Sequence, residues 1–254
     1  MRDEGLDVRP APGDRVGVRV LELWRFPVKS LQGERVEAAD ARADGLTGDR
    51  RWALFDLDTG FGLTARRVPD LLGAAGRLRA DGGCDVVLPD GTVTSDDEVL
   101  SGWLERRVTL RSADQPTRRR YENLDDAEDE SGRWHPFEGS GRSFHDSEAF
   151  AVSLVSTASL GEWDRRRFRS NVVLDGSGED QLVGSRVRLG DALLDVVASV
   201  PRCVMTTRAQ PGGIARDTSV LRTIHQERGG VLAVGAGVVT AGRIAVGDEL
   251  AQVR

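Results

Sequence analysis

Lysine is almost absent from this sequence. Of the 35 lysine and arginine residues in the 254-residue chain, Lys29 is the only lysine and all the others are arginine. A lysine kept in such an arginine-rich chain suggests a position that needs a compact, strongly hydrated ammonium rather than a planar guanidinium. Pro27 restricts the nearby backbone and Ser30 adds a hydroxyl, so residues 26–30 are a candidate anion-binding corner. The alternative is a lysine on an exposed surface turn.

Cysteine and long apolar runs are scarce too. Cys84 and Cys203 are the two cysteines, far apart in sequence, which excludes a disulfide framework and any Cys-x-x-Cys motif. No apolar run approaches the roughly 18 residues of a membrane-spanning helix. Residues 1–15 are charged and lack the apolar core of a secretory signal. We therefore expect a cytoplasmic protein with no membrane attachment.

The charge pattern also argues against nucleic acid as a partner. The formal net charge is −6, and the arginine run 118–120 is soon followed by an acidic run at 125–130. Opposed charge blocks of this kind are typical of a solvated loop. His135 and His145 follow these charged runs in the sequence. They have neither the spacing of zinc ligands nor cysteine partners, so we expect both to be surface histidines.

Short alternating segments predict a mainly β (α+β) fold. We expect strands near 16–21, 51–56, 151–155 and 172–174, and hairpins at 86–94 and 187–197. In the first hairpin, Asp90 and Gly91 form the turn. Helices are expected after the capping residues at 95–98, 156–157 and 217–218. The first should bury an apolar stripe and the third an inner face, made of Val99, Leu100, Trp103 and Leu104 and of Val220, Leu221 and Ile224 respectively. Many short strands with a few short helices favour β-barrel architecture.

A polar, charge-blocked segment divides the chain. Residues 112–148 show no periodic apolar pattern, so we expect a long, partly mobile loop there. The predicted organisation is an N-terminal β-barrel module at 16–111, a charged linker or loop at 112–139 and a second domain at 140–254.

Two stretches could carry chemistry. Cys203 follows a predicted strand beside Arg202, and an adjacent arginine can lower the pKa of a thiol and favour the thiolate. The alternative is a small buried residue, which is also how we interpret Cys84. Arg169 and Asn171 lie just before another predicted strand, where a guanidinium could bind phosphate and an amide a heterocycle edge. A solvated turn is the alternative there.

The sequence does not support binding of a dinucleotide or of pyridoxal phosphate. The glycines at 235 and 237 lack the third glycine of a dinucleotide-binding loop and precede no predicted helix. Lys29 could in principle form a Schiff base with pyridoxal phosphate, but nothing else in the sequence supports that reaction.

Taken together and in this order, the motifs resemble the MOSC family, named for the C-terminal domain of molybdenum cofactor sulfurase. The resemblance covers nearly the whole chain and implies an N-terminal MOSC-type β-barrel module followed by a MOSC β-barrel domain. The residues that carry it are Phe-Pro-Val-Lys-Ser at 26–30, Gly45-Leu46, Asp49-Arg50, Thr64-Ala65-Arg66 with Pro69, Arg167-Phe168-Arg169-x-Asn171, Arg202-Cys203 with Thr206, Val220-Leu221-Arg222 and Ile244-x-Val246-Gly247-Asp248.

The amidoxime-reducing components of this family are molybdenum enzymes that reduce N-hydroxylated compounds. The resemblance implies a molybdopterin cofactor whose molybdenum is ligated by Cys203, and a soft thiolate suits such a metal. It further implies reduction of N–O bonds in a small-molecule substrate. With only two cysteines the chain cannot ligate an iron–sulfur cluster, so electrons would come from a separate protein. The cofactor would be held by Lys29, Ser30, Arg50, Arg169, Asn171 and Arg202.

Two alternatives remain within the resemblance. Cys203 could carry a persulfide for sulfur transfer, or the protein could carry molybdopterin without turnover. The sequence also departs from the family pattern at Ser170, Pro201 and residues 210–213. These positions lie close to the expected site, so they leave the substrate open more than the fold.

Overall fold

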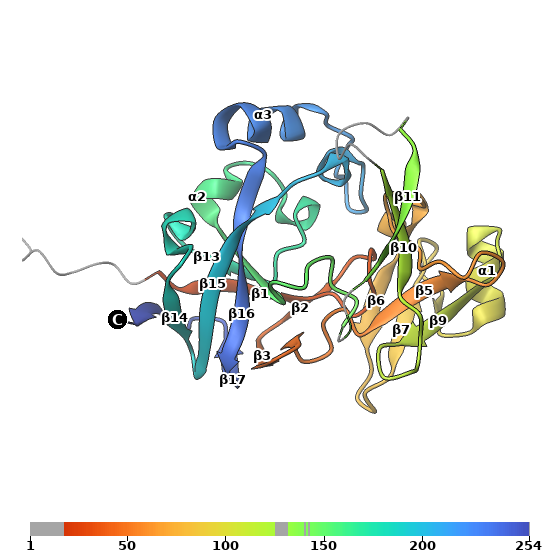
Figure 1. Ribbon diagram of the computed structural model, residues 1–254, viewed down its shortest axis with the longest axis horizontal. Helices are drawn as coiled ribbons and strands as arrows, with labels where there is room; N and C mark the ends of the chain where they lie inside the picture. Colours follow the sequence, from red (N-terminus) through yellow and green to blue (C-terminus); the bar gives the residue numbers. More distant parts are fainter. Residues whose placement is uncertain (1–17, 125–131, 140, 142, 254) are drawn as a thin grey trace, which may run out of the picture.

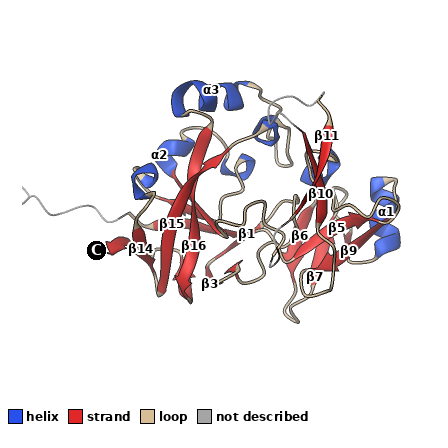
Figure 2. Cartoon of the chain, in the orientation of Figure 1, coloured by secondary structure: helices blue, strands red, loops and turns tan. Residues whose placement is uncertain are grey.

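The structure is a computed structural model that describes residues 18–124, 132–139, 141 and 143–253 (Figure 1). Strands dominate, with a few short helices at the periphery (Figure 2). The mainly β prediction is therefore confirmed. Among the described residues, no helix has the length and apolar character needed to cross a membrane.

The largest sheet has eight strands in the order β18-β14-β15-β16-β12-β13-β1-β2. Every neighbouring pair is antiparallel except β12 and β13, which are parallel. The strands are β1 Val20–Arg25, β2 Glu34–Val36, β12 Val152–Ser156, β13 Val172–Leu174, β14 Arg186–Leu189, β15 Ala192–Pro201, β16 Val231–Thr240 and β18 Leu250–Val253.

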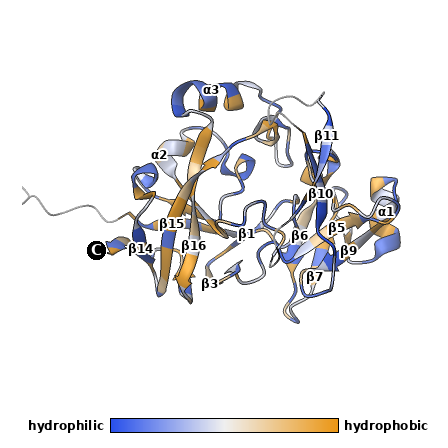
Figure 3. Ribbon diagram, viewed as in Figure 1, coloured by the Kyte–Doolittle hydropathy of each residue, from blue (hydrophilic) through white to orange (hydrophobic). Residues whose placement is uncertain are grey.

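This sheet curls so that the start of β18 returns to the residues at the start of β1. The Val20 amide donates to the Asp248 carbonyl at 2.9 Å, and the Leu250 amide donates to the Val18 carbonyl at 2.8 Å. Inward residues alternate along β15, where Leu194 and Val196 are almost fully buried. Figure 3 shows β15 and β16 as hydrophobic along most of their length, as expected for strands that enclose a core.

The N-terminal strands take part in this C-terminal barrel. Besides β1 and β2, strand β3 (Ala38–Arg42) pairs with β17 (Gly242–Ala245) and with β4 (Gly45–Leu46). Sheet pairing thus crosses the domain boundary that the sequence suggests at residue 111. The boundaries themselves stay a prediction.

A second body of strands follows β4. Strand β5 pairs with β9, and β6, β7 and β8 form a three-stranded sheet that contains the predicted Asp90–Gly91 hairpin. Its core is made of buried leucines and valines, including Leu54 and Leu71. The elements are β5 Trp52–Asp56, η1 Pro69–Gly73, β6 Ala75–Leu78, β7 Cys84–Val87, β8 Val93–Thr94, α1 Asp97–Leu104 and β9 Val108–Ser112.

Helix α1 begins within the predicted capping segment 95–98, with Asp96 rather than Ser95 as its N-cap residue. The Asp96 carboxylate accepts from the amides of Glu98 at 2.8 Å and Val99 at 3.1 Å. Leu100 and Leu104 are buried, but Val99 is 42% exposed, contrary to the expected apolar stripe. A two-turn helix buries one i, i+4 pair, and Val99 lies off that face.

The expectation of a loop over 112–148 is wrong in part. Strands β10 (Arg120–Leu124) and β11 (Trp134–Glu138) form an antiparallel hairpin in this segment. It is anchored by Tyr121, which is 2% exposed and whose ring lies 6.1 Å from that of Phe55. Because β10 is largely hydrophilic (Figure 3), alternation of apolar residues could not reveal it. The acidic run at 125–130 lies outside the described residues.

The remaining helices lie beside the C-terminal barrel, with α3 at one end of β15 and β16 (Figure 1). The predicted inner residues of α3, Val220, Leu221 and Ile224, are all buried. The helix ends at Gly229, whose φ of +61° is the left-handed conformation that glycine favours. The elements are α2 Thr157–Leu160, η2 Arg165–Arg167, η3 Glu179–Leu182, η4 Val204–Thr207 and α3 Ser219–Arg228.

Candidate functional site

Lys29 is a buried residue, so the surface-turn alternative is wrong. Its side chain is 5% exposed, and its ammonium donates to the Phe144 carbonyl at 3.2 Å. It also makes an ion pair with the carboxylate of Asp146. The ring centroid of Tyr121 lies 4.9 Å from the lysine nitrogen. Residues more than 90 positions further along the chain thus supply the partners of this lysine.

Arg50 and Arg169 meet on Phe26. Each guanidinium carbon lies 5.0 Å from the centroid of the Phe26 ring, a cation–π distance. Arg50 also donates to the Arg169 carbonyl at 3.2 Å and pairs with Asp49. Asp49 is fully buried and accepts from the Phe26 amide at 2.7 Å. Residues from both halves of the chain are therefore fixed around one ring.

These charges act on one another, and we call Lys29, Arg50 and Arg169 the cation cluster. Burial and the like charge of Arg50 together lower the pKa of Arg169 to about 10. Asp146 pairs with Lys29 and also feels the charges of Arg50 and Arg169. The surrounding protein would raise the pKa of Asp146, but the charge and hydrogen bond of Lys29, with Arg50 and Arg169, lower it to about 2. Its side chain is nevertheless 87% exposed, so solvent reaches the carboxylate.

Cys203 is half-buried at the end of β15, directly before η4. Burial raises the pKa of its thiol, and the charge of Asp146 adds to that effect. Arg66 and Arg202 lower this pKa, as expected for neighbouring cations, but burial is the larger effect. Arg202 thus acts in the predicted direction, but the net shift of the Cys203 pKa is upward because the thiol loses contact with water.

Arg202 has unused hydrogen-bonding capacity. It donates to the carbonyls of Leu232 at 2.8 Å and Phe168 at 2.9 Å. Its Nη2 atom is buried and has no hydrogen-bond partner among the residues that the structure describes. Burial lowers the pKa of Arg202 to about 10, although the charge of Cys203 acts in the opposite direction. A buried donor without an acceptor is costly, so an acceptor-bearing ligand would be stabilised here.

Arg167 fixes the turn that carries Cys203. It is 9% exposed and donates to the carbonyls of Thr206 and Arg208, both at 3.1 Å, and of Ala215 at 2.6 Å. The Thr206 hydroxyl donates to the Cys203 carbonyl at 3.0 Å. The arginine-rich motif thus includes a residue that holds the backbone rather than a ligand.

Ser30 and Asn171, two predicted cofactor-binding residues, differ in backbone conformation and in hydrogen bonding. Ser30 is half-buried with a φ of +70°, a left-handed conformation that is strained for serine. Asn171 is 1% exposed, and its amide joins the Trp24 carbonyl and the Ser153 amide, both at 3.2 Å. Those contacts give Asn171 a structural role between β1 and β12. A cofactor role for either residue stays a prediction.

Sequence reasoning missed Asp146 and Tyr121, and it misplaced His145. His145 is not a surface residue: it is partly buried, and its Nε2 atom lies 3.1 Å from the Asp44 carbonyl. His135 is exposed, as expected. All the missed residues lie in the segment interpreted as a loop, and no local pattern marks a single acid as the partner of a distant lysine. Among the described residues, no three histidine, cysteine or acidic side chains group around a metal position.

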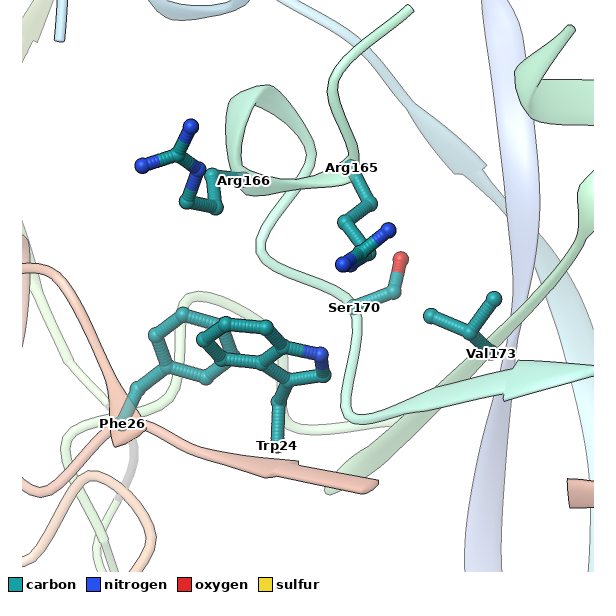
Figure 4. A pocket seen from close by; sticks show the side chains of 6 residues that line it. All are labelled: Trp24, Phe26, Arg165, Arg166, Ser170 and Val173. Carbon is teal, nitrogen blue, oxygen red and sulfur yellow. The ribbon is translucent and has the colours of Figure 1, made fainter. Parts of the chain in front are cut away.

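A small hollow adjoins the cation cluster through Phe26. Figure 4 shows Trp24 and Phe26 on one side, Arg165 and Arg166 on the other, and the Ser170 hydroxyl between them. The two rings are stacked with centroids 6.5 Å apart. The enclosed space is about 10 Å³, enough for one water. A larger hollow of about 520 Å³ lies elsewhere, against the second body of strands, and is lined in part by Asp56 and Glu122.

Comparison with known proteins relates the chain to characterised families. Residues 17–134 match the MOSC N-terminal beta barrel domain, and residues 141–251 match the MOSC domain. The mitochondrial amidoxime reducing component 2 of Bos taurus is 26% identical over 87% of this chain and 76% of that protein. The molybdenum cofactor sulfurase of Drosophila grimshawi is 28% identical over 85% of this chain.

The chain spans only 31% of the length of that sulfurase. Among solved structures, the YUAD protein of Bacillus subtilis covers 92% of this chain and 93% of its own, with 13% identity and a TM-score of 0.42. The YiiM protein of Geobacillus stearothermophilus covers 47% of this chain and 67% of its own, with 18% identity and a TM-score of 0.36.

Proposed function

This chain belongs to the MOSC family, with a MOSC N-terminal beta barrel domain and a MOSC domain, and from this premise we propose that it is a molybdenum-cofactor-dependent oxidoreductase. The proposed reaction is reduction of N-hydroxylated or related oxidised small molecules. The observation that carries the proposal is the buried Nη2 donor of Arg202, directly before Cys203, which has no acceptor among the described residues. The charge of Asp146, the ion-pair partner of Lys29, also acts on the Cys203 thiol.

The residues present fit a molybdopterin. A thiolate is a soft ligand, suited to a metal that is already held by sulfur. The cation cluster offers one ammonium and two guanidinium groups for a phosphate, and arginine can bind such a group in a bidentate manner. The buried Nη2 donor of Arg202 lacks an acceptor among the described residues, which an anionic group beside Cys203 would supply.

When bound, the cofactor would supply the two-electron redox chemistry. The chain would supply the thiolate ligand for the metal, the groups that orient the cofactor and the positive charge that binds its phosphate. Cys203 must lose its proton to bind a metal, and Arg66 and Arg202 favour that loss. Arg167 would keep the Cys203 turn in place through its three backbone carbonyls. Electrons would come from a separate donor protein. We also propose that the protein is cytoplasmic.

Sulfur transfer is the second candidate, and the match to molybdenum cofactor sulfurase favours it. In that case Cys203 would carry a persulfide, and no molybdenum would be needed at the thiol. A non-catalytic molybdopterin carrier would bind the same cofactor without turnover. Metal and pterin content separates sulfur transfer from the other two functions, and turnover separates the reductase from the carrier.

The decisive experiment compares metal and pterin content after expression in a host that makes molybdenum cofactor. Wild type should contain nearly stoichiometric molybdenum and pterin, and Cys203→Ser should lose the metal and all reduction of an N-hydroxylated test compound. Cys84→Ala is the matched control, because Cys84 is buried in the β6–β8 core. Folded wild-type protein with neither molybdenum nor pterin would refute the reductase. A persulfide on Cys203 would then establish sulfur transfer, and bound cofactor without turnover would establish the carrier.

A further inference from the structure

The ammonium of Lys29 is closed to external anions by its own partners. Lysine has three N–H donors, and here the Phe144 carbonyl, the Asp146 carboxylate and the Tyr121 ring surround the nitrogen. Because the side chain is 5% exposed, an anion can reach it only if one of these groups moves.

Asp146 is the partner that can move. Phe144 is 1% exposed and its amide donates to the Arg50 carbonyl at 2.8 Å, so its backbone is fixed from both sides. Tyr121 is 2% exposed and packed against other rings. The Asp146 side chain is 87% exposed, and rotation about its own side-chain bonds would take the carboxylate into solvent.

Asp146 also has the chemistry of the expected ligand. An ionised carboxylate is an acceptor-only anion, as a phosphate is. It is paired with Lys29, and the charges of Arg50 and Arg169 act on it as well, so it interacts with all three cations offered above for the phosphate of the cofactor. A carboxylate and a phosphate could not both sit among these three charges without repelling each other.

We propose that Asp146 is an internal counter-ion that occupies the anion position of the cation cluster and is displaced when a phosphate group binds. The inference rests on the proposed function, because it takes the cation cluster as the place for the cofactor phosphate. It adds a specific property of this chain: the affinity for phosphate is set by competition with a side chain that the protein itself carries.

This competition predicts whether replacing Asp146 strengthens or weakens phosphate binding. Asp146→Asn removes the charge that a phosphate must displace, so phosphate should bind more tightly than to wild type. We expect a gain of about tenfold, the scale of one charge-assisted hydrogen bond to Lys29. Asp146→Ser should behave in the same way, because it also removes the charge and leaves a small polar group.

The experiment is calorimetric titration of the full chain with inorganic phosphate at constant ionic strength, using protein from a host without molybdenum cofactor. Asp114→Asn is the matched control, because Asp114 is an exposed acid paired with Arg51 and its loss changes the net charge equally. The control should bind as wild type does. Adding Lys29→Gln to Asp146→Asn should abolish the gain.

Two results would overturn the proposal. The first is phosphate affinity in both Asp146 variants that is equal to or weaker than that of wild type. The second is an equal gain in Asp114→Asn, which would make the effect one of net charge. Cofactor-loaded protein should no longer bind phosphate, whereas unchanged binding would refute the cofactor phosphate as occupant. The titrations of cofactor-free protein need neither Cys203 nor turnover, so this inference and the proposed reductase can fail separately.

Discussion

Single residues decide the charge state of the site, and most of them act through burial. Asp49, fully buried, balances Arg50 and fixes the Phe26 amide. Removing one member of a buried ion pair leaves an uncompensated charge, which is far more damaging than loss of a surface pair. Arg169 and Arg202 have lowered pKa values for the same reason, although both stay protonated at neutral pH.

At this scale, His145 should make stability depend on pH. Burial lowers its pKa, and the charges of Arg50 and Lys29 lower it further. The unfolded state, with a histidine pKa of about 6.5, therefore binds a proton at a higher pH than the folded state does. The contribution of His145 to stability is complete above that pH and is lost progressively as the pH falls below it.

Urea denaturation between pH 8 and pH 5 measures this effect. The wild type should lose stability on acidification more steeply than His145→Gln, which carries no titrating ring. His225→Gln, on the exposed side of α3, serves as the control and should follow the wild type. Parallel curves for wild type and His145→Gln would contradict the prediction.

At the scale of elements, the space around two glycines shows how closely neighbouring elements pack. Gly62 runs directly beneath Tyr121 of β10, and a methyl group there would lie 2.2 Å from the ring. The β10–β11 hairpin can therefore dock on the loop after β5 only because this position has no side chain. Gly102, within α1, has no atom near its missing Cβ.

These two glycines predict opposite effects of the same substitution. Gly62→Ala should destabilise the protein by about 1–3 kcal/mol, because the buried ring must shift. Gly102→Ala should stabilise it by about 0.5–1 kcal/mol, since alanine is the better helix former and meets no neighbour. Free energies of unfolding from urea titrations test both. A Gly62→Ala variant as stable as wild type would show that close packing under Tyr121 does not govern this hairpin, and a destabilised Gly102→Ala variant would contradict the prediction for α1.

At the scale of the whole molecule, the two family domains are not independent bodies. Strand β1 lies between β13 and β2 in the C-terminal sheet, and β3 pairs with β17. Val20, Leu23 and Ala41 contribute to the core of that barrel. The candidate site depends on this arrangement too. Phe26 and Arg50 belong to the N-terminal domain, whereas Arg169 belongs to the C-terminal domain.

A fragment of residues 140–254 should therefore fail to fold cooperatively. Without β1 and β3, the strands β13 and β17 would present unpaired edges, and part of the barrel core would be open to water. Near-ultraviolet circular dichroism and urea titration of the fragment and the full chain test this expectation. A fragment that unfolds cooperatively at the midpoint of the full chain would establish the predicted boundary as a true domain boundary.

The sequence by itself determined the local structure and the chemical inventory. Alternating valines, the Asp90–Gly91 turn and the cap at Asp96 depend on neighbours within a few residues, so the strands, hairpin and helix could be predicted. Lys29 and Cys203 stood out by scarcity and setting. The β10–β11 hairpin could not be predicted, because polar strands are defined by the partner on which they dock.

Only the tertiary structure decided how the charges combine. It placed Asp146 against Lys29 and set Arg50 and Arg169 on one aromatic ring. It also set the net pKa shift of Cys203, since burial outweighs the lowering by the neighbouring arginines. Hydrophobic pattern and turn chemistry are local, whereas Coulomb interactions and loss of water depend on which distant segments the fold brings together.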